Sequence, residues 1–295
     1  MRIGIAGVGR MGAAIALHLV EAGHSLTVWN RSAEKTKPLA DAGAAVAKTP
    51  TELADAVEAV ITILTNSAAM SDVYEGSAGL LAGDVKGKLF IEMSTVQPHE
   101  EAALAKKVQA RGAVFVECPV GGTVGPARQG KLLGVAGGAK EDFERAKPLL
   151  DQMCRRVEHV GPVGAGSSMK LALNLPLMVY YQALGESLLL CRHLGLDNAW
   201  LMEFLSDTSG APSVLKTRGP AIASALDGKD IGVANFDVDL ICKDLRTMLA
   251  EAEQRGATLP VVRQTLAIYE QAAADGWGKR DGAWLPAYWG TKLGR

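Results

Sequence analysis

The chain has 295 residues, 48% of them hydrophobic and 21% charged, a composition typical of a folded globular protein with more than one hydrophobic core. Its 31 lysines and arginines nearly balance its 32 aspartates and glutamates, so electrostatics gives no reason to expect a nucleic acid or an anionic membrane as partner. The longest apolar run, residues 171–181, is shorter than the roughly 20 residues of a membrane span. We expect no secretion signal, and the scattered cysteines favour free thiols in a reducing cytoplasm over a metal site.

Residues 2–32 show the pattern of a strand, a glycine turn, an amphipathic helix and a second strand. The glycines of the turn have the spacing G-x-G-x-x-G, which permits a tight turn, close approach of a pyrophosphate and close packing of the helix on the strand. A merely tight turn is the alternative, but the second strand ends where a dinucleotide site requires it. The expected cofactor residues of the turn are Gly7, Val8, Gly9, Arg10, Met11 and Gly12.

The second strand ends in Asn30, Arg31 and Ser32. NAD sites usually carry an acid here for the ribose 2′-hydroxyl, whereas a nearby arginine accommodates the 2′-phosphate of NADP. A guanidinium and a hydroxyl pair well with phosphate, so NADP(H) is favoured. The alternative is a solvated Arg31 in an enzyme that also accepts NAD(H).

Two further segments, residues 57–66 and 88–98, each predict a buried strand that ends in small polar residues. Ligands of open parallel sheets bind beyond the carboxyl ends of the strands. We therefore expect the nicotinamide side of the site to be lined by Leu64, Thr65, Ser94 and Thr95. Another strand and a glycine-rich loop (121–130) follow, which could bind an anion through backbone N–H groups or simply connect two strands.

From residue 166 onward the pattern is helical. A long apolar helix starts there, and later segments around residues 239–256 and 259–276 show helical spacing and end in glycines. The predicted fold is an α/β Rossmann-type doubly wound sheet (1–163) followed by an all-α domain (164–295), with a long helix between the domains. Such an apolar helix also predicts a homodimer or homotetramer.

The long helix carries Lys170 and Asn174 on one face, one turn apart. Lysine is almost never fully buried unless it is paired. The alternative is a side chain that extends into water, but a helix that leaves a dinucleotide domain should present its first turns to the cleft where substrates bind.

Five motifs are distinctive in combination. They are the glycine turn, Ser94-Thr95, the segment ECPVGGTVGPARQGKL, the pattern from Gly164 and Gly166 to Lys170 and Asn174, and FDVDLICKDL with Lys243. Together they resemble the β-hydroxyacid dehydrogenase family over the whole chain, and within it the NADPH-dependent glyoxylate/succinic semialdehyde reductases.

The resemblance implies that Lys170 is the catalytic acid/base, that Asn174 orients the substrate, and that Lys243 closes over nicotinamide and substrate. It also implies cofactor contacts from Leu64, Thr65 and Thr95. Three features depart from the family pattern: Glu117 stands where an aspartate is usual, the loop Ser-Gly-Gly is Gly121-Gly122-Thr123, and the Asn pair on the long helix is Leu173-Asn174. The glycine amides are therefore expected to bind a substrate carboxylate, with Thr123 offering a hydroxyl.

A lysine that is protonated at neutral pH can donate a proton to a carbonyl oxygen as hydride arrives, so reduction is the easier direction. The expected activity is reduction of a small carboxylate-bearing aldehyde or keto acid. Alternatives are an imine reductase, which usually lacks this lysine, and a non-catalytic dinucleotide-binding module. A histidine mechanism is disfavoured because no histidine lies near an Asp/Arg constellation.

Overall fold

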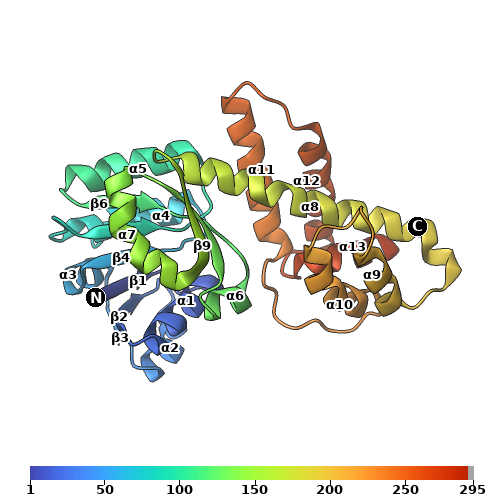
Figure 1. Ribbon diagram of the computed structural model, residues 1–295, viewed down its shortest axis with the longest axis horizontal. Coiled ribbons are helices and arrows are strands. Elements are labelled where there is room, and N and C mark those ends of the chain that lie inside the picture. The colour runs from blue at the N-terminus through green and yellow to red at the C-terminus, as the bar shows by residue number, and fades with distance from the viewer. Residues whose placement is uncertain (292–295) are drawn as a thin grey trace. The chain divides into compact units, whose positions relative to one another are not determined.

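The computed structural model describes residues 1–291, and the chain divides into two compact units, Met1–Ala172 and a second that begins at Leu173 (Figure 1). The first unit is the predicted Rossmann-type domain and the second is helical, which confirms the predicted fold class. The domain boundary expected between residues 163 and 164 stays a prediction. No helix within residues 1–291 is both long and apolar enough to cross a lipid bilayer.

The first unit is built on one sheet with the strand order β3-β2-β1-β4-β5-β6-β8-β7, and β9 pairs with β8. The first six strands are parallel, whereas β8 runs antiparallel to β6. Three strands, β3, β7 and β9, were not predicted. The strand bounds are β1 Arg2–Ala6, β2 Ser25–Trp29, β3 Ala45–Val46, β4 Ala59–Thr62, β5 Leu89–Glu92, β6 Val114–Glu117, β7 Val120–Gly121, β8 Leu132–Gly137 and β9 Cys154–Gly161.

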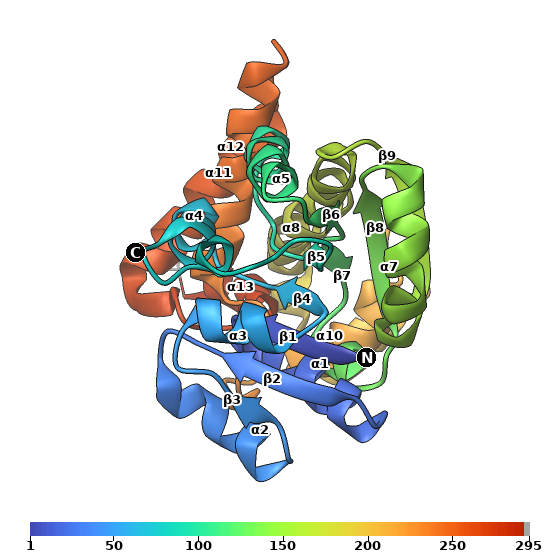
Figure 2. The ribbon, with the colours of Figure 1, turned by 90° about the vertical axis from the view of Figure 1, so that its left-hand side faces the viewer.

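Helices cover both faces of this sheet, as Figure 2 shows. One core cluster joins the sheet to α1, α2 and α7, and a second joins it to α3, α4 and α5. The strands β4 and β5 are buried throughout because both faces are covered. Helix bounds in this unit are α1 Arg10–Glu21, α2 Lys37–Asp41, α3 Pro50–Ala56, α4 Ser67–Glu75, α5 Pro98–Ala110, α6 Val124–Arg128 and α7 Lys140–Met153, with 3₁₀ turns at Ala33–Thr36 and Leu80–Ala82.

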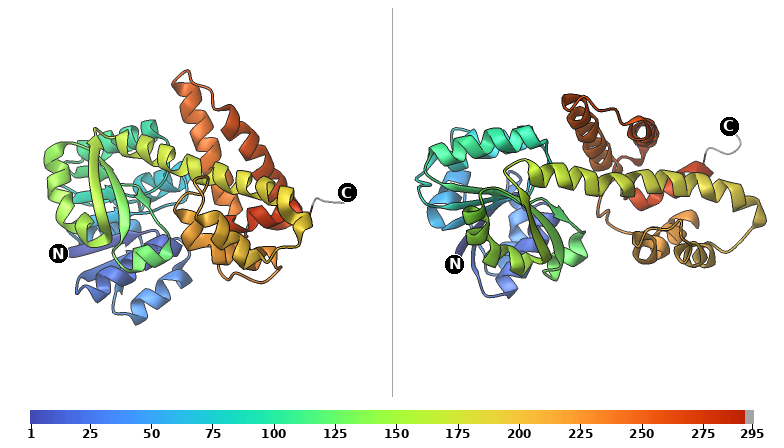
Figure 3. Two further views of the ribbon diagram at one scale, coloured as in Figure 1. Left: turned by 45° about the vertical axis from the view of Figure 1, so that its right-hand side comes forward. Right: turned by 45° about the horizontal axis from the view of Figure 1, so that its top comes forward.

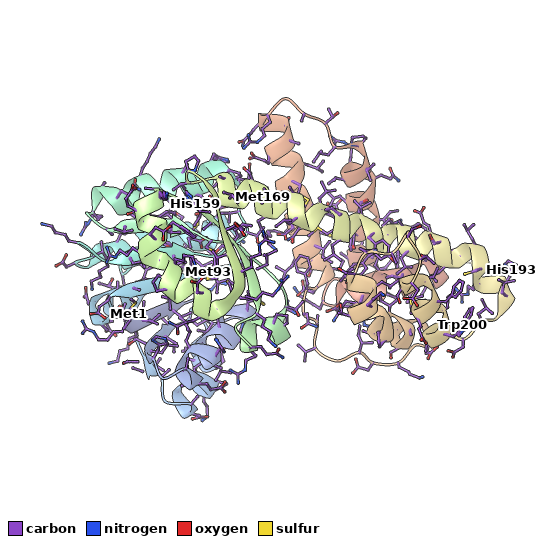
Figure 4. All side chains as sticks on the ribbon, in the orientation of Figure 1. Met1, Met93, His159, Met169, His193 and Trp200 are labelled. Atoms are coloured by element: carbon purple, nitrogen blue, oxygen red, sulfur yellow. The ribbon has the colours of Figure 1, made fainter. Side chains whose placement is uncertain are left out.

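Strand β9 packs against α7, where His159, labelled in Figure 4, stacks on Phe143 with ring centroids 5.0 Å apart. Most residues of β9 are exposed or half-buried, and several are charged. Its sequence therefore lacks the apolar pattern that predicts a strand.

Helix α8, Ala165–Cys191, is one uninterrupted helix of 27 residues (Figure 3). Its first eight residues belong to the first unit and the remainder to the second. The predicted long helix is therefore confirmed, and it carries Lys170 and Asn174 four residues apart.

The second unit consists of the rest of α8 and shorter helices around it. Tyr269 of α12 is fully buried here, and its hydroxyl donates to the Met178 carbonyl of α8 at 3.2 Å. In the same unit, the Arg280 guanidinium lies over the rings of Trp277 and Trp284, 4.2 and 4.6 Å from their centroids. The helix bounds are α9 Asn198–Ser206, α10 Val214–Leu226, α11 Val238–Gln254, α12 Pro260–Ala272 and α13 Leu285–Gly290, with 3₁₀ turns at Arg192–Leu194 and Gly282–Trp284 and a π-helical turn at Ala273–Trp277.

Candidate active site

The three motif glycines between β1 and α1 differ in their steric surroundings. Gly7 has a φ of +98°, and a Cβ there would lie 2.4 Å from the Ile63 carbonyl oxygen. A Cβ on Gly12 would lie 2.0 Å from the Gly7 oxygen, so only glycine lets the helix pack this closely. At Gly9, the N-cap of α1, a Cβ would meet no described atom within 4 Å. The turn therefore presents an unobstructed helix N-terminus, which fits the pyrophosphate of a dinucleotide.

Asn30 ties the glycine turn to the end of β2. Its Oδ1 accepts a hydrogen bond from the Val8 N–H at 3.1 Å, and its Nδ2 donates to the Ser32 carbonyl at 2.9 Å. One amide thus connects the loop after β1 with the loop after β2, and it uses both its acceptor and its donor to do so.

A pocket of about 380 Å³ lies beyond the carboxyl ends of β1, β2 and β4, entirely within the first unit. Its volume is in the range of pockets that hold small ligands. Seven of the predicted cofactor residues line it: Gly7, Gly9, Asn30, Arg31, Ser32, Leu64 and Thr65. The other predicted cofactor residues of this unit lie outside that wall as the structure describes it: Val8, Arg10, Met11, Gly12 and Thr95.

Sequence reasoning missed two charged residues of the pocket wall, Lys35 and Asp72. Lys35 lies in the 3₁₀ turn that begins one residue after Ser32, so it joins Arg31 as a second cation on this wall. Inspecting the residues one helical turn after Arg31 for further cations would have identified Lys35. Asp72 belongs to α4, and no sequence pattern around it indicates that it lines a pocket.

Ser94 joins the loops that follow β4 and β5. The Leu64 N–H donates to Ser94 Oγ at 2.8 Å, and the Ser94 N–H donates to Glu92 at 2.8 Å. The Ser94 hydroxyl donates to the other Glu92 oxygen. Burial raises the pKa of the Glu92 carboxyl, and hydrogen bonds, Ser94 among them, offset part of the rise. Glu92 therefore fixes the Ser94 side chain that links the loops after β4 and β5, beside the expected nicotinamide position.

The segment predicted as a glycine-rich loop is more ordered than expected. Gly121 belongs to β7 and pairs with Leu133, and Thr123 is the N-cap of α6. The prediction of one loop over residues 121–130 is wrong, because β8 offers an antiparallel partner that the local sequence does not reveal. Only Gly122 and Gly130 adopt positive φ within this segment. Substrate binding by Gly121, Gly122 and Thr123 stays a prediction.

Lys170 lies in the second turn of α8 and belongs to the first unit. Its exposed fraction is 7%, whereas a lysine extended over the surface into water would be largely exposed. Its role in the reaction stays a prediction.

In the second unit, Asn174 and Lys243 are brought together by Asp244. The Asn174 amide donates to Asp244 Oδ2 at 3.2 Å, and Lys243 Nζ lies 2.6 Å from Asp244 Oδ1. Asp244 is only 3% exposed, and in this buried setting the Lys243 ammonium compensates its charge while the Asn174 amide donates a hydrogen bond to it. Asp239, which lies one helical turn before Lys243, instead has its Oδ2 2.8 Å from Lys279 Nζ.

A doubly wound sheet whose glycine turn opens a helix N-terminus beside a pocket defines a dinucleotide-binding protein. Comparison with known proteins agrees. The family profile described as the NAD binding domain of 6-phosphogluconate dehydrogenase matches residues 2–161. A second, described as NAD-binding of NADP-dependent 3-hydroxyisobutyrate dehydrogenase, matches residues 164–287.

Individual relatives cover nearly the whole chain. Mitochondrial 3-hydroxyisobutyrate dehydrogenase of Bos taurus is 34% identical over 95% of this chain and 84% of that protein. Glyoxylate/succinic semialdehyde reductase 1 of Arabidopsis thaliana is 30% identical over 95% of this chain and 96% of that protein. The solved structure of Psf3 in complex with NADP+ and 2-OPP has a TM-score of 0.86 and 26% identity, covering 97% of this chain and 99% of that one. The chain therefore belongs to the β-hydroxyacid dehydrogenase family of oxidoreductases, and its cofactor is a nicotinamide dinucleotide.

Proposed function

We propose that this protein uses NADPH to reduce a small carboxylate-bearing aldehyde or keto acid to the hydroxyacid, with Lys170 as the general acid. The observation that carries the proposal is the buried Lys170 in the same compact unit as the dinucleotide pocket. The semialdehyde reductase among the relatives supports the substrate class.

The bound coenzyme would supply the hydride. Lys170, as an ammonium, donates a proton to the carbonyl oxygen as negative charge develops there. In the reverse direction Lys170 would first have to lose that proton, which makes reduction the easier direction. We further propose that Asn174 orients the substrate, that Lys243 contacts cofactor and substrate, and that Gly121, Gly122 and Thr123 bind the carboxylate.

The pocket wall supports NADPH over NADH. Arg31 and Lys35 are cations and Ser32 offers a hydroxyl, a set that suits a 2′-phosphate. We expect Lys35→Ala to lower kcat/KM for NADPH by about 10-fold and to leave that for NADH nearly unchanged, because a hydrogen bond to a charged group is worth about 1.5 kcal/mol or more. Lys37→Ala is the matched control, since Lys37 pairs with Asp41 and does not line the pocket. Equal kcat/KM for both coenzymes in the wild type would support dual use instead.

The role of Lys170 is tested by Lys170→Ala and by Lys170→Arg, which keeps a cation that does not give up its proton. We expect both variants to lose measurable turnover of glyoxylate and succinic semialdehyde, a loss of about 10²–10⁴-fold or more. Cofactor affinity, measured by quenching of tryptophan fluorescence, should stay within a few-fold. Substantial activity in Lys170→Ala would refute the assignment, and wild-type turnover of a cyclic imine alone would favour an imine reductase.

Two further proposals concern assembly and location. We propose a cytoplasmic homodimer or homotetramer, supported in the second unit by exposed apolar side chains such as Leu190, Phe204 and Trp200, the last labelled in Figure 4. Light scattering during gel filtration measures the mass, and a monomeric mass would contradict the proposal.

A further inference from the structure

The start of α8 is held by a carboxylate from a distant strand. Glu117, the last residue of β6, is fully buried, and its Oε1 accepts hydrogen bonds from the N–H groups of Gly164 (2.5 Å) and Gly166 (2.8 Å). Its Oε2 accepts a hydrogen bond from the Ser167 hydroxyl at 2.7 Å. Both oxygens of one side chain are therefore engaged with the first turn of this helix.

This carboxylate takes the place of a local cap. The Gly164 carbonyl accepts the first hydrogen bond of α8, from the Ser168 N–H at 3.0 Å, so Gly164 occupies the N-cap position. Caps are usually Ser, Thr, Asp or Asn, whose side chains accept from the first N–H groups of the helix. Gly164 has no side chain, and Glu117 supplies the missing acceptor together with a negative charge at the positive end of the helix.

Neighbouring glycines make room for the carboxylate. A Cβ on Gly137 would lie 2.2 Å from Glu117 Oε1. A Cβ on Gly166 would lie 2.5 Å from the Val135 carbonyl oxygen and 3.2 Å from Glu117 Oε1. Backbones from β8 and α8 thus approach the carboxylate closely, and a side chain at either glycine would clash with its surroundings.

The ionised form suits this environment. Burial raises the pKa of the Glu117 carboxyl, whereas its hydrogen bonds to the first turn of α8 lower it. All three contacts place a donor on the carboxylate, so each is satisfied when the group carries no proton.

Lys170 follows Ser167 by three residues, which is about one helical turn and a rise of about 4.5 Å. A rigid helix transmits any shift of its first turn to this side chain. We propose that Glu117 is a positioning residue for Lys170: it anchors the first turn of α8 to the end of β6 and so sets where the Lys170 amine lies. The consequence for turnover rests on the proposed role of Lys170 as the acid.

The test compares Glu117→Ala with Glu117→Gln and uses two readouts. Alanine removes every contact, whereas glutamine keeps an oxygen for the two backbone donors and an NH₂ group that can donate to the Ser167 hydroxyl. Asp197→Ala is the matched control, because Asp197 is another carboxylate that accepts a hydrogen bond from the first turn of a helix, α9, and it lies in the second unit. The readouts are kcat with KM and cofactor Kd, and the rate at which acetic anhydride modifies Lys170, followed by mass spectrometry with exposed Lys86 as internal reference.

We expect Glu117→Ala to lower kcat by about 100-fold, the size of effect that a misplacement of about 1 Å produces, while cofactor Kd stays within 3-fold. Lys170 should be modified at least 10-fold faster in that variant. Glu117→Gln should recover kcat to within about 10-fold of the wild type and restore slow modification. Asp197→Ala should leave both readouts unchanged.

Unchanged modification of Lys170 in Glu117→Ala would overturn the proposal, and so would a glutamine variant as impaired as the alanine variant. Faster modification with undiminished kcat in an active enzyme would also overturn it. A wild type without any carbonyl reductase activity would refute the proposed function alone, since the modification rates decide the anchoring without turnover.

Discussion

Two helices of the first unit begin after glycine-rich turns, and their N-termini are used in opposite ways. Helix α1 starts at an unobstructed turn, where a Cβ on Gly9 would meet no described atom within 4 Å. Helix α8 starts at Gly164, where the Glu117 carboxylate already accepts hydrogen bonds from the first turn. The same preference of a helix N-terminus for negative charge serves ligand binding in one place and internal anchoring in the other.

The difference teaches that glycine spacing before a helix does not by itself identify a ligand site. What separates the two cases is whether a core carboxylate reaches the helix end. At α8 the Glu117 carboxylate accepts from the first N–H groups and Gly166 lets the Val135 backbone approach, whereas at α1 Gly7 and Gly12 accommodate backbone and leave Gly9 facing open space. Four substitutions test this comparison.

The largest effect is expected for Gly12→Ala. Its Cβ would lie 2.0 Å from the Gly7 oxygen, so the helix must move away from the turn that binds the cofactor. Overpacking of this kind costs about 1–3 kcal/mol of stability, and we expect cofactor affinity to fall by more than about 100-fold. Calorimetry of NADPH binding together with thermal unfolding checks both, and wild-type affinity would contradict the steric role assigned to Gly12.

Gly166→Ala is the corresponding change at α8. Alanine normally stabilises a helix interior relative to glycine, but here its Cβ would clash with the Val135 carbonyl oxygen. We expect kcat to fall by about 100-fold with NADPH affinity within 3-fold, because only the anchored helix is displaced. Parallel losses of kcat and of affinity would show that the two helix ends are not independent.

Gly9→Ala should produce a smaller and different effect. The added methyl group has space in the protein, so the melting temperature should stay within about one degree of the wild type. The methyl group would still obstruct approach of an anion to the helix end, and we expect affinity for NADPH to fall by about 10-fold, equivalent to about 1.4 kcal/mol. A large drop in melting temperature would contradict the open space at this position.

Glu101→Gln addresses a buried glutamate that anchors no helix end. Burial first, and then the negative charge of Glu92, raise the pKa of the Glu101 carboxyl well above its usual value. The folded protein therefore holds a proton that the unfolded chain releases, and stability conferred by this group falls as pH rises from about 4.5 through the raised pKa. We expect the variant to gain on the order of 1 kcal/mol relative to the wild type between pH 5 and pH 8, measured by urea unfolding. A constant difference across this range would contradict a raised pKa.

Much of the first unit could be predicted because its signals are local. The glycine turn, the buried strands at β4 and β5 and the long helix α8 each depend on residues close together in the sequence. The same holds for Arg31 and Ser32, which lie two and three residues after the end of β2.

What escaped prediction depends on contacts between distant segments. Glu117 reaches Gly164 across 47 positions, and Asn174 reaches Asp244 across 70. Strand β7 exists because β8 returns antiparallel beside it. No periodicity in the sequence encodes such pairings, and a lone glutamate before Cys118 gives no sign that it caps a helix.

The double use of Asn30 has a consequence for changing coenzyme preference. Aspartate at this position is the usual way to favour NAD, but it would put a carboxylate against the Ser32 carbonyl and lose the donor that now bridges them. A change of coenzyme preference toward NADH, by design or by evolution, must then replace residues 30 to 32 together. Aspartate at position 30 alone would loosen the loop that has to bind the new coenzyme.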